Sequence, residues 1–132
     1  MTKHELFRLA DKAREKSYSP YSNITVGAAL LSRSGKVYTG ANIENAAYSP
    51  SVCAERVAIF SAINAGEREF LSIAVAGGKR GESARENFTP CGVCRQVMAE
   101  FCNRDFKVVL SESDEINFSE LLPFRFDGDK IK

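Results

Sequence analysis

The sequence has little net charge and no long hydrophobic run, and each absence argues against a class of partner. Its 18 basic and 17 acidic residues leave a formal net charge of +1, whereas binding to a nucleic-acid backbone calls for a clustered basic face. No apolar run is long enough to cross a membrane, and the N-terminus lacks the pattern of a secretory signal. We therefore expect a cytoplasmic protein that acts on a small molecule and binds neither nucleic acid nor membrane.

Internal repeats, low-complexity tracts and linkers are also missing. The chain has 132 residues, of which 44% are hydrophobic and 27% are charged, and this is the composition of one ordinary globular domain. We expect residues 1–132 to form that single domain. The only extended polar stretch, 79–87, is predicted to be a surface loop.

Hydrophobic periodicity predicts alternating helices and strands. An amphipathic helix through 6–13 is followed by a hairpin with a turn at 33–35. Later apolar segments predict two buried helices and two buried strands, and a short helical turn precedes Pro123. The predicted ranges after the first helix are 24–31 and 36–42 for the hairpin, 53–65 and 91–102 for the buried helices, 71–76 and 106–110 for the strands, and 119–122 for the last turn. This order predicts an α/β fold, a three-layer α/β/α sandwich with a mixed sheet.

Four cysteines supply the candidate metal ligands. Zinc takes thiolates in a tetrahedral shell, and a catalytic site leaves one of the four positions open for water. If Cys91 opens a helix, Cys94 lies one turn later on the same face, whereas Cys102 lies about 16 Å from Cys91 along the axis. His4, the only histidine, falls in the first turn of a predicted surface helix. The sequence therefore favours Cys53, Cys91 and Cys94 as zinc ligands, with a position left for water.

Other interpretations of these cysteines remain open. Free cysteines are often simply buried, which suits Cys102 and could suit Cys53. A lone Cys-x-x-Cys also occurs as a redox pair in thioredoxin-like proteins, but that use leaves Cys53 and Glu55 without a role. A disulfide framework is disfavoured because the chain is long enough to form a core without it.

The expected helix starts explain how the cysteines could meet. Thr89 is predicted to cap the second buried helix with Pro90 at its first position, so that Cys91 falls in the first turn. Residues two apart on a regular helix point to nearly opposite sides. Cys53 must therefore lie at the very start of its helix if Glu55 is to share a site with it.

Glu55 and Arg56 have a chemical and a structural interpretation. Three thiolates on a divalent ion leave a net charge of about −1 on the metal centre. We expect Arg56 to donate hydrogen bonds to one or two of the sulfurs and so restore the Lewis acidity of the metal. The alternatives are that Glu55 is a helix-opening acid and that Arg56 is a solvated surface residue.

The chain contains five ordered segments that are specific in combination. They are Pro20-Tyr21-Ser22, Val26-Gly27-Ala28-Ala29-Leu30, Asn42-Ile43-Glu44-Asn45-Ala46-Ala47-Tyr48, Cys53-Ala54-Glu55 and Pro90-Cys91-Gly92-Val93-Cys94-Arg95-Gln96. Together they resemble the short, homotetrameric class of cytidine deaminase, and the match runs from the first helix to about Pro123. The resemblance implies zinc-dependent hydrolytic deamination of cytidine and deoxycytidine to uridine and deoxyuridine, with release of ammonia and a role in pyrimidine salvage. Glu55 would carry the protons in that reaction.

The same resemblance implies substrate contacts. Asn42 and Glu44 would hold the ribose, and the N–H of Ala54 would steady the base carbonyl or the bound intermediate. Arg56 and Gln96 would support the metal ligands. Tyr48 and a C-terminal ring, Phe124 or Phe126, would complete a site shared between subunits of a homotetramer.

Ile24 departs from the family pattern. The family usually places there a phenylalanine that stacks on the pyrimidine, a contact worth roughly 0.5–1.5 kcal/mol beyond burial. We therefore expect weaker substrate binding with the chemistry retained. Two alternative functions stay open: deamination of another aminopyrimidine, such as a nucleoside of the blasticidin type, and a non-enzymatic zinc-stabilised module. Asn42 and Glu44 argue against the first, and Glu55 argues against the second.

Overall fold

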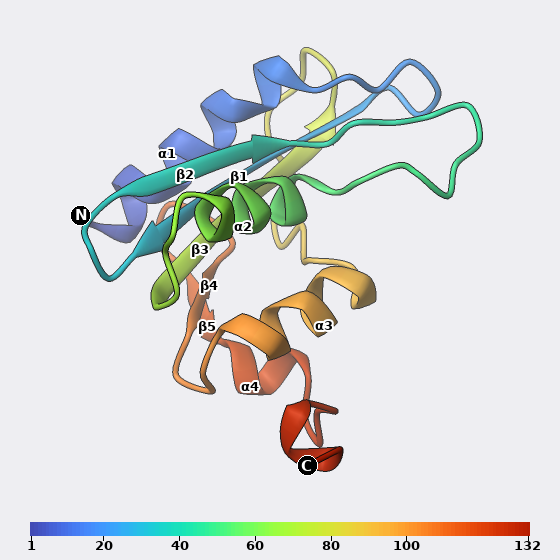
Figure 1. The fold of residues 1–132 in the computed structure, drawn as a ribbon. Helices are drawn as coiled ribbons and strands as arrows, with labels where there is room; N and C mark the ends of the chain where they lie inside the picture. The colour runs from blue at the N-terminus through green and yellow to red at the C-terminus, as the bar shows by residue number, and fades with distance from the viewer.

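A five-stranded mixed sheet organises the fold (Figure 1). The computed structural model describes all residues, 1–132. Strand β1 runs antiparallel to β2 and β3, β3 is parallel to β4, and β4 is antiparallel to β5. The strands are β1 (Ile24–Ser32), β2 (Val37–Ala41), β3 (Phe70–Lys79), β4 (Lys107–Val109) and β5 (Glu115–Asn117), in the spatial order β2-β1-β3-β4-β5. The predicted mixed sheet is confirmed.

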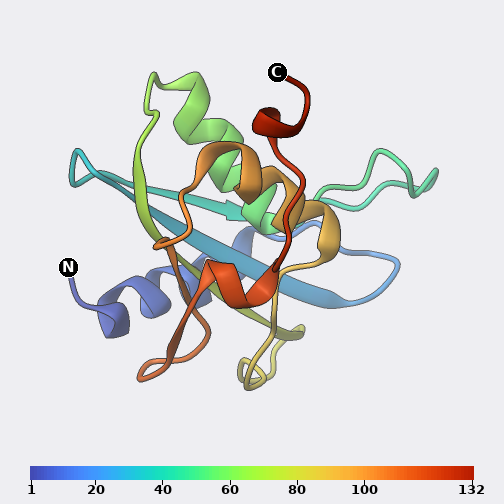
Figure 2. The same ribbon diagram turned by 90° about the horizontal axis from the view of Figure 1, so that it is seen from below.

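Helices cover both faces of this sheet (Figures 1 and 2). One face carries α1 (Lys3–Ala13), which continues into the 3₁₀ turn η1 (Arg14–Lys16). The other face carries α2 (Ala54–Asn64), α3 (Gly92–Phe101) and α4 (Phe118–Leu121), and the chain ends after η2 (Gly128–Lys130). Two separate buried clusters fill the layers, the larger under α2 and α3 and the smaller under α1. The predicted α/β/α sandwich is therefore confirmed.

Helix α1 begins at a capping box. The Thr2 hydroxyl accepts a hydrogen bond from the Glu5 N–H, and the Glu5 carboxylate accepts one from the Thr2 N–H, which satisfies two of the free donors at the helix start. The helix packs very closely on β1, because a Cβ built at Gly27 would lie 1.9 Å from the carbonyl oxygen of Ala10. Only glycine permits this backbone contact.

A second glycine brings α2 against the sheet. A Cβ built at Gly40, in β2, would lie 2.5 Å from the Ala54 carbonyl oxygen and 2.6 Å from the Ala58 backbone nitrogen. The first turn of α2 therefore rests directly on the strand backbone. This contact determines where the start of α2, and with it Cys53, is held.

Two local predictions need correction, and one strand was not predicted. Strand β3 does not stop at Gly77-Gly78 but continues to Lys79, because the two glycines leave room for the segment that follows: a Cβ at Gly78 would lie 3.0 Å from the Ser83 carbonyl oxygen. Helix α3 is capped by Cys91, not by Thr89. The short strand β5 is an addition that the sequence pattern did not predict.

The predicted polar loop is tied to η1 by one buried arginine. Arg14 is 7% exposed, and its guanidinium donates to the carbonyl oxygens of Lys79 and Glu82 and to both oxygens offered by Thr25. The loop is thus held at its beginning, before the chain enters α3. None of the helices combines the length and the apolar character needed to span a membrane.

Candidate metal centre and substrate cavity

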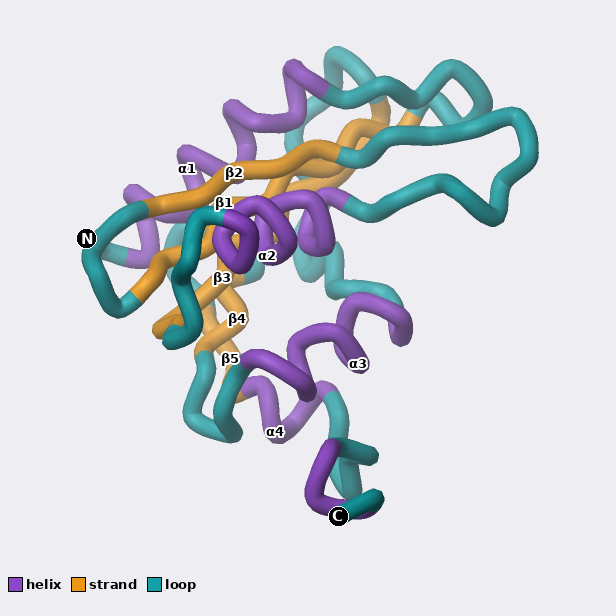
Figure 3. Tube along the Cα trace, viewed as in Figure 1, coloured by secondary structure: helices purple, strands orange, loops and turns teal.

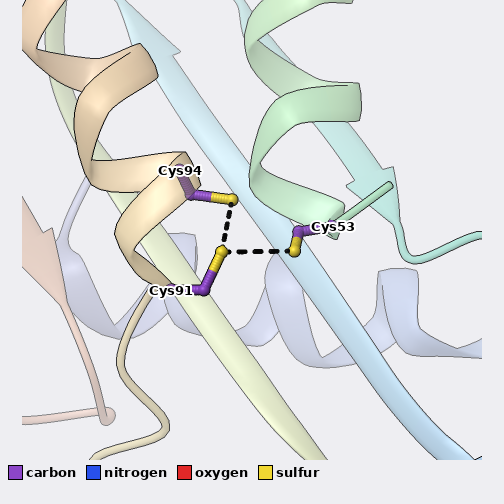
Figure 4. A group of neighbouring side chains, drawn as sticks. All are labelled: Cys53, Cys91 and Cys94. Atoms are coloured by element: carbon purple, nitrogen blue, oxygen red, sulfur yellow. Dashed lines mark hydrogen bonds between the residues drawn. The ribbon is translucent and has the colours of Figure 1, made fainter. Parts of the chain in front are cut away.

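Three cysteines from two helix starts converge on one point (Figure 4). Cys53 is the N-cap of α2, Cys91 is the N-cap of α3, and Cys94 lies in the first turn of α3. The Sγ atom of Cys91 is 3.5 Å from the Sγ atoms of both Cys53 and Cys94, and all three sulfurs lie within 4.8 Å of one another. The sequence prediction that these three cysteines come together agrees with this geometry.

The sulfur spacing fits a zinc ion. Zn–S bonds of about 2.3 Å in a tetrahedral shell place two sulfurs about 3.8 Å apart, close to the 3.5 Å found here. Both N-cap residues have extended backbones, so their side chains project beyond the helix ends. Unpaired N–H groups and the positive dipole ends of α2 and α3 therefore lie beside the sulfurs and favour their ionised forms.

The thiols influence one another strongly. The pKa of Cys53 is lowered to about 5, chiefly because the Cys94 thiol hydrogen-bonds to the Cys53 thiolate, with a further contribution from Arg56. The same interaction, together with burial, raises the pKa of Cys94. The cluster therefore favours the thiolate form of Cys53, and a bound cation would favour that of Cys94.

Glu55 lies beside this cluster and is shielded from solvent. It is 3% exposed, and its Oε1 atom has no hydrogen-bond partner. Burial raises its pKa to about 7. Because Cys53 is the N-cap and not part of the regular helix, Cys53 and Glu55 can share one site although they are two residues apart.

Arg56 contacts a sulfur, as the sequence predicted. Its Nη2 atom donates to the Sγ of Cys53 at 3.5 Å, and that bond is the main reason why the pKa of Arg56 is raised. The Nε atom of Arg56 is buried without a partner.

A cavity of about 440 Å³ opens onto these groups, within the range typical of small-molecule sites. Its lining combines two of the three clustered cysteines, the acid and residues from the long loop between β2 and α2 that Figure 3 shows: Val26, Asn42, Glu44, Ser51, Val52, Cys53, Glu55, Arg56, Phe88, Thr89 and Cys91. A larger hollow of about 670 Å³ lies along the outer side of α1. It contains none of the cysteines, and we therefore assign the site to the smaller cavity.

Asn42 and Glu44 both line the cavity, but their side chains form most of their hydrogen bonds with other residues of the chain. The Asn42 side chain accepts from the Ser17 hydroxyl and the Val26 N–H and donates to the Ile24 carbonyl oxygen. Glu44 accepts from Ser22, through both its hydroxyl and its N–H, and from the Tyr21 N–H. The bond from the Ser22 hydroxyl is the main reason why the pKa of Glu44 is lowered. Both side chains are therefore rigidly placed, with little bonding capacity left over.

Other predicted contacts lie around this cavity or outside it. Tyr48 is 71% exposed and packs edge-on against Tyr21 in an adjoining hollow that shares Glu44. Ala54, the first residue of α2, is fully buried. Ile24 is not among the lining residues and packs instead against the larger core cluster. It precedes Val26 by two residues on β1, so its side chain lies on the same face of the sheet as the cavity.

The C-terminal segment presents its aromatic rings outward. Phe124 is fully exposed and Phe126 is 57% exposed. Gln96 does not hydrogen-bond to a cysteine but donates to the carbonyl oxygen of Phe126, while Arg125 donates to the carbonyl oxygen of Cys102. Gln96 therefore anchors the C-terminal segment.

The remaining two candidate ligands lie outside the cluster. Cys102 is buried in the larger core cluster at the end of α3, and burial raises its pKa to about 12. His4 lies on α1, on the other face of the sheet, 3.6 Å from Glu112. Phe88 was missed by the sequence interpretation, although its place three residues before Cys91 could have marked it as a neighbour of the site.

Comparison with known proteins decides the family. Residues 1–110 match the family model described as the cytidine and deoxycytidylate deaminase zinc-binding region. A cytidine deaminase of Halalkalibacterium halodurans is 46% identical to this chain over 99% of its length and 98% of the relative's. This chain belongs to the cytidine deaminase family. A cytidine deaminase of Sporosarcina psychrophila is 43% identical, over 99% and 96% of the two chains.

Solved structures of cytidine deaminases have the same fold. The enzyme from Burkholderia pseudomallei is 47% identical and superposes with a TM-score of 0.86, over 96% of this chain and all of the other. The enzyme from Mycobacterium tuberculosis is 33% identical with a TM-score of 0.81, over 92% and 94% of the two chains. The predicted family, enzyme class, fold class and zinc cofactor are confirmed.

Proposed function

We propose that this chain catalyses the zinc-dependent hydrolytic deamination of cytidine and deoxycytidine to uridine and deoxyuridine, with release of ammonia, as a step in pyrimidine salvage. The observation that carries the proposal is the buried carboxylate of Glu55. Its Oε1 atom has no hydrogen-bond partner, and the residue lines the same cavity as Cys53 and Cys91. The names of the most similar relatives and the zinc-binding description of the matched family support it.

Cys53, Cys91 and Cys94 would hold the zinc. When bound, zinc supplies a Lewis acid that brings the pKa of a coordinated water close to neutrality. Arg56, donating to Cys53, draws negative charge away from the sulfurs and so preserves that acidity. An unpartnered Nε atom leaves Arg56 one more donor for the same purpose.

Glu55 carries the protons. With its pKa near 7, both the carboxylate and the carboxylic acid are populated at neutral pH, which suits a group that must act as base and then as acid. As the carboxylate it accepts a proton from the attacking water. As the acid it protonates the ring nitrogen beside carbon four. It then accepts the remaining proton of the hydroxyl group added to carbon four and delivers it to the amine, which leaves as ammonia while the carbonyl forms.

Asn42 and Glu44 hold the sugar. After its bond to Ile24, the amide nitrogen of Asn42 retains one free N–H, and the Glu44 carboxylate retains acceptor capacity beyond its three bonds. A ribose hydroxyl between them can accept from the first and donate to the second. The N–H of Ala54, in the first turn of α2, lacks an intrahelical partner and donates to the base carbonyl.

The assembly and the location form the remaining parts of the proposal. Tyr48, Phe124 and Phe126 expose aromatic rings, and covering such rings is a common reason for association. We expect a homotetramer in which one of the C-terminal rings reaches the site of a neighbouring subunit, with Tyr48 at that boundary. All four cysteines are free, which suits a reducing, cytoplasmic compartment.

The decisive experiment follows the ultraviolet absorbance of cytidine incubated with the zinc-loaded protein, with Glu55→Ala and Glu55→Gln measured beside it. We expect turnover in the parent and at least a 10²-fold loss in both variants at unchanged zinc content. Glu86→Gln, at an exposed loop position, is the matched control and should behave like the parent. A zinc-loaded parent without turnover would refute the proposal, and aminopyrimidine nucleosides of the blasticidin type would then be tested as substrates.

A further inference from the structure

Phe88 supplies the only aromatic ring among the residues that line the cavity. It lies in the segment between β3 and α3, three residues before Cys91. The other apolar side chains of the wall are aliphatic, Val26 and Val52, and the rest of the lining is polar or sulfur-bearing. A flat, conjugated base that enters this cavity can contact only one aromatic ring, that of Phe88.

The Phe88 ring packs over Gly77 of strand β3, and we call this position the seat of the ring. A Cβ built at Gly77 would lie 2.6 Å from Cδ1 of Phe88 and 2.7 Å from its Cε1 and Cγ atoms, so the ring occupies the space that any other side chain at position 77 would fill. Gly77 pairs with Val26 on β1. Phe88 and Val26 therefore form one continuous wall whose position is set by the strand backbone.

The backbone that leads to Phe88 is held as well. The Arg85 N–H donates to the Gly77 carbonyl oxygen at 2.8 Å, and Arg14 holds the start of the same segment through the carbonyl oxygens of Lys79 and Glu82. On the other side of Phe88, Pro90 is fully buried. A ring fixed from both directions loses little conformational entropy when a ligand packs against it.

We infer that Phe88 is a specificity-determining residue, whose ring packs on the pyrimidine and favours conjugated bases over saturated ones. The inference rests on the proposed function. Aromatic pairs prefer offset-stacked or edge-to-face arrangements and gain energy beyond the area they bury. Phe88 thereby provides the aromatic contact that Ile24 cannot provide, from the segment between β3 and α3, where its ring lies over Gly77.

The test compares Phe88→Leu and Phe88→Tyr with the parent, all zinc-loaded. Loss of the ring contact in Phe88→Leu should raise KM for cytidine roughly 2- to 12-fold. Because the base packs on the ring as it binds, before carbon four is attacked, the loss should appear in KM, and kcat should not fall more than about twofold below that of the parent. Phe88→Tyr, which keeps the ring, should retain the parent KM.

A saturated ligand separates stacking from general support of the cavity. Tetrahydrouridine carries the same sugar on a ring that is not conjugated, so its dissociation constant should change much less than KM for cytidine in Phe88→Leu. Phe7→Leu is the matched control, because Phe7 is buried under α1 on the other face of the sheet. It should lower the melting temperature and leave both ligand constants unchanged. An unchanged KM in Phe88→Leu, or equal weakening of both ligands, would overturn the inference.

The seat itself gives a second test. Gly77→Ala should displace the ring and raise KM in the parent, but it should add little in the Phe88→Leu background, where the ring is already gone. If the increases in KM of the two single variants multiply in the double variant, the role of the seat is overturned. If Gly77→Ala does not fold, the Phe88 variants still decide the inference. A zinc-loaded parent that neither binds nor converts cytidine overturns the proposed function along with it, whereas a parent that turns over normally and does not differ from Phe88→Leu overturns the inference alone.

Discussion

Replacing Gly40 by alanine should loosen the metal centre without touching any of its ligands. The new Cβ would lie 2.5 Å from the Ala54 carbonyl oxygen, whereas ordinary contact begins at 3.4 Å, so the first turn of α2 must retreat by about 0.9 Å. Cys53 caps that turn and moves with it, while Cys91 and Cys94 stay on α3. Zinc–ligand distances tolerate only about 0.2 Å. We therefore expect zinc to be lost at least 10-fold more readily and kcat/KM to fall by about 10²-fold.

The assay is competition for zinc with a chelator of known affinity, followed by cytidine turnover at saturating zinc. Overpacking of this kind costs about 1–3 kcal/mol of folding stability, so a thermal melt must first show that Gly40→Ala is folded at the assay temperature. Gly128→Ala is the control, because nothing lies within 4 Å of a Cβ built there. A folded Gly40→Ala variant with parental zinc retention and turnover would refute the argument that this close contact positions Cys53.

Three further predictions address single side chains. Arg56→Gln removes the donor to Cys53 and should lower both zinc retention and kcat, by about 10-fold or more; unchanged values in both assays would show that the contact is incidental. Ile24→Phe should lower KM for cytidine roughly 2- to 12-fold if a ring at the start of β1 reaches the base, and an unchanged KM would place Ile24 outside the substrate site. Glu67 accepts hydrogen bonds from Ser32, Ser34 and Tyr38, with the bond from Ser32 the main reason why its pKa is lowered from 4.5. The contribution of Glu67 to stability is therefore full above about pH 4.5 and is lost as the pH falls through the lowered pKa. The melting temperature of Glu67→Gln should therefore depend less steeply on pH below 4.5 than that of the parent. Parallel curves of melting temperature against pH would contradict this.

Part of the cysteine cluster was predictable because two of its constraints are local. A helix that opens at Cys91 places Cys94 on the same side one turn later, and the argument that Cys53 must lie at the very start of its helix needs only the 100° step between residues. Both conclusions agree with the geometry of the structure, in which Cys53 and Cys91 are N-caps. The error at Thr89 is a shift of two residues at a helix start, where a favourable cap residue competed with the residue that actually caps.

The glycines of β3 misled the sequence interpretation for a physical reason. Gly77-Gly78 has the composition of a turn, but here both residues continue a strand and leave space for groups that are distant in the sequence: the Phe88 ring over Gly77 and the Ser83 carbonyl over Gly78. A single sequence does not distinguish a glycine needed for its backbone freedom from one needed for its missing side chain. Phe88 was overlooked for the same reason, because its role depends on a seat eleven residues earlier.

The arrangement of Asn42 and Glu44 explains why their proposed role in sugar binding and their role in the fold are difficult to separate. The Asn42 side chain fixes the start of β1 through Ile24 and Val26, and Glu44 fixes the turn before β1 through Tyr21 and Ser22. Each side chain therefore uses most of its hydrogen-bonding positions to hold the cavity wall in place, and only a few remain for a ligand. Substituting Asn42 by aspartate removes the donor to the Ile24 carbonyl and adds a charge at a nearly buried position, so we expect loss of stability and loss of sugar binding together. Binding that weakened at unchanged melting temperature would show that the ligand contact and the structural contacts of Asn42 are independent.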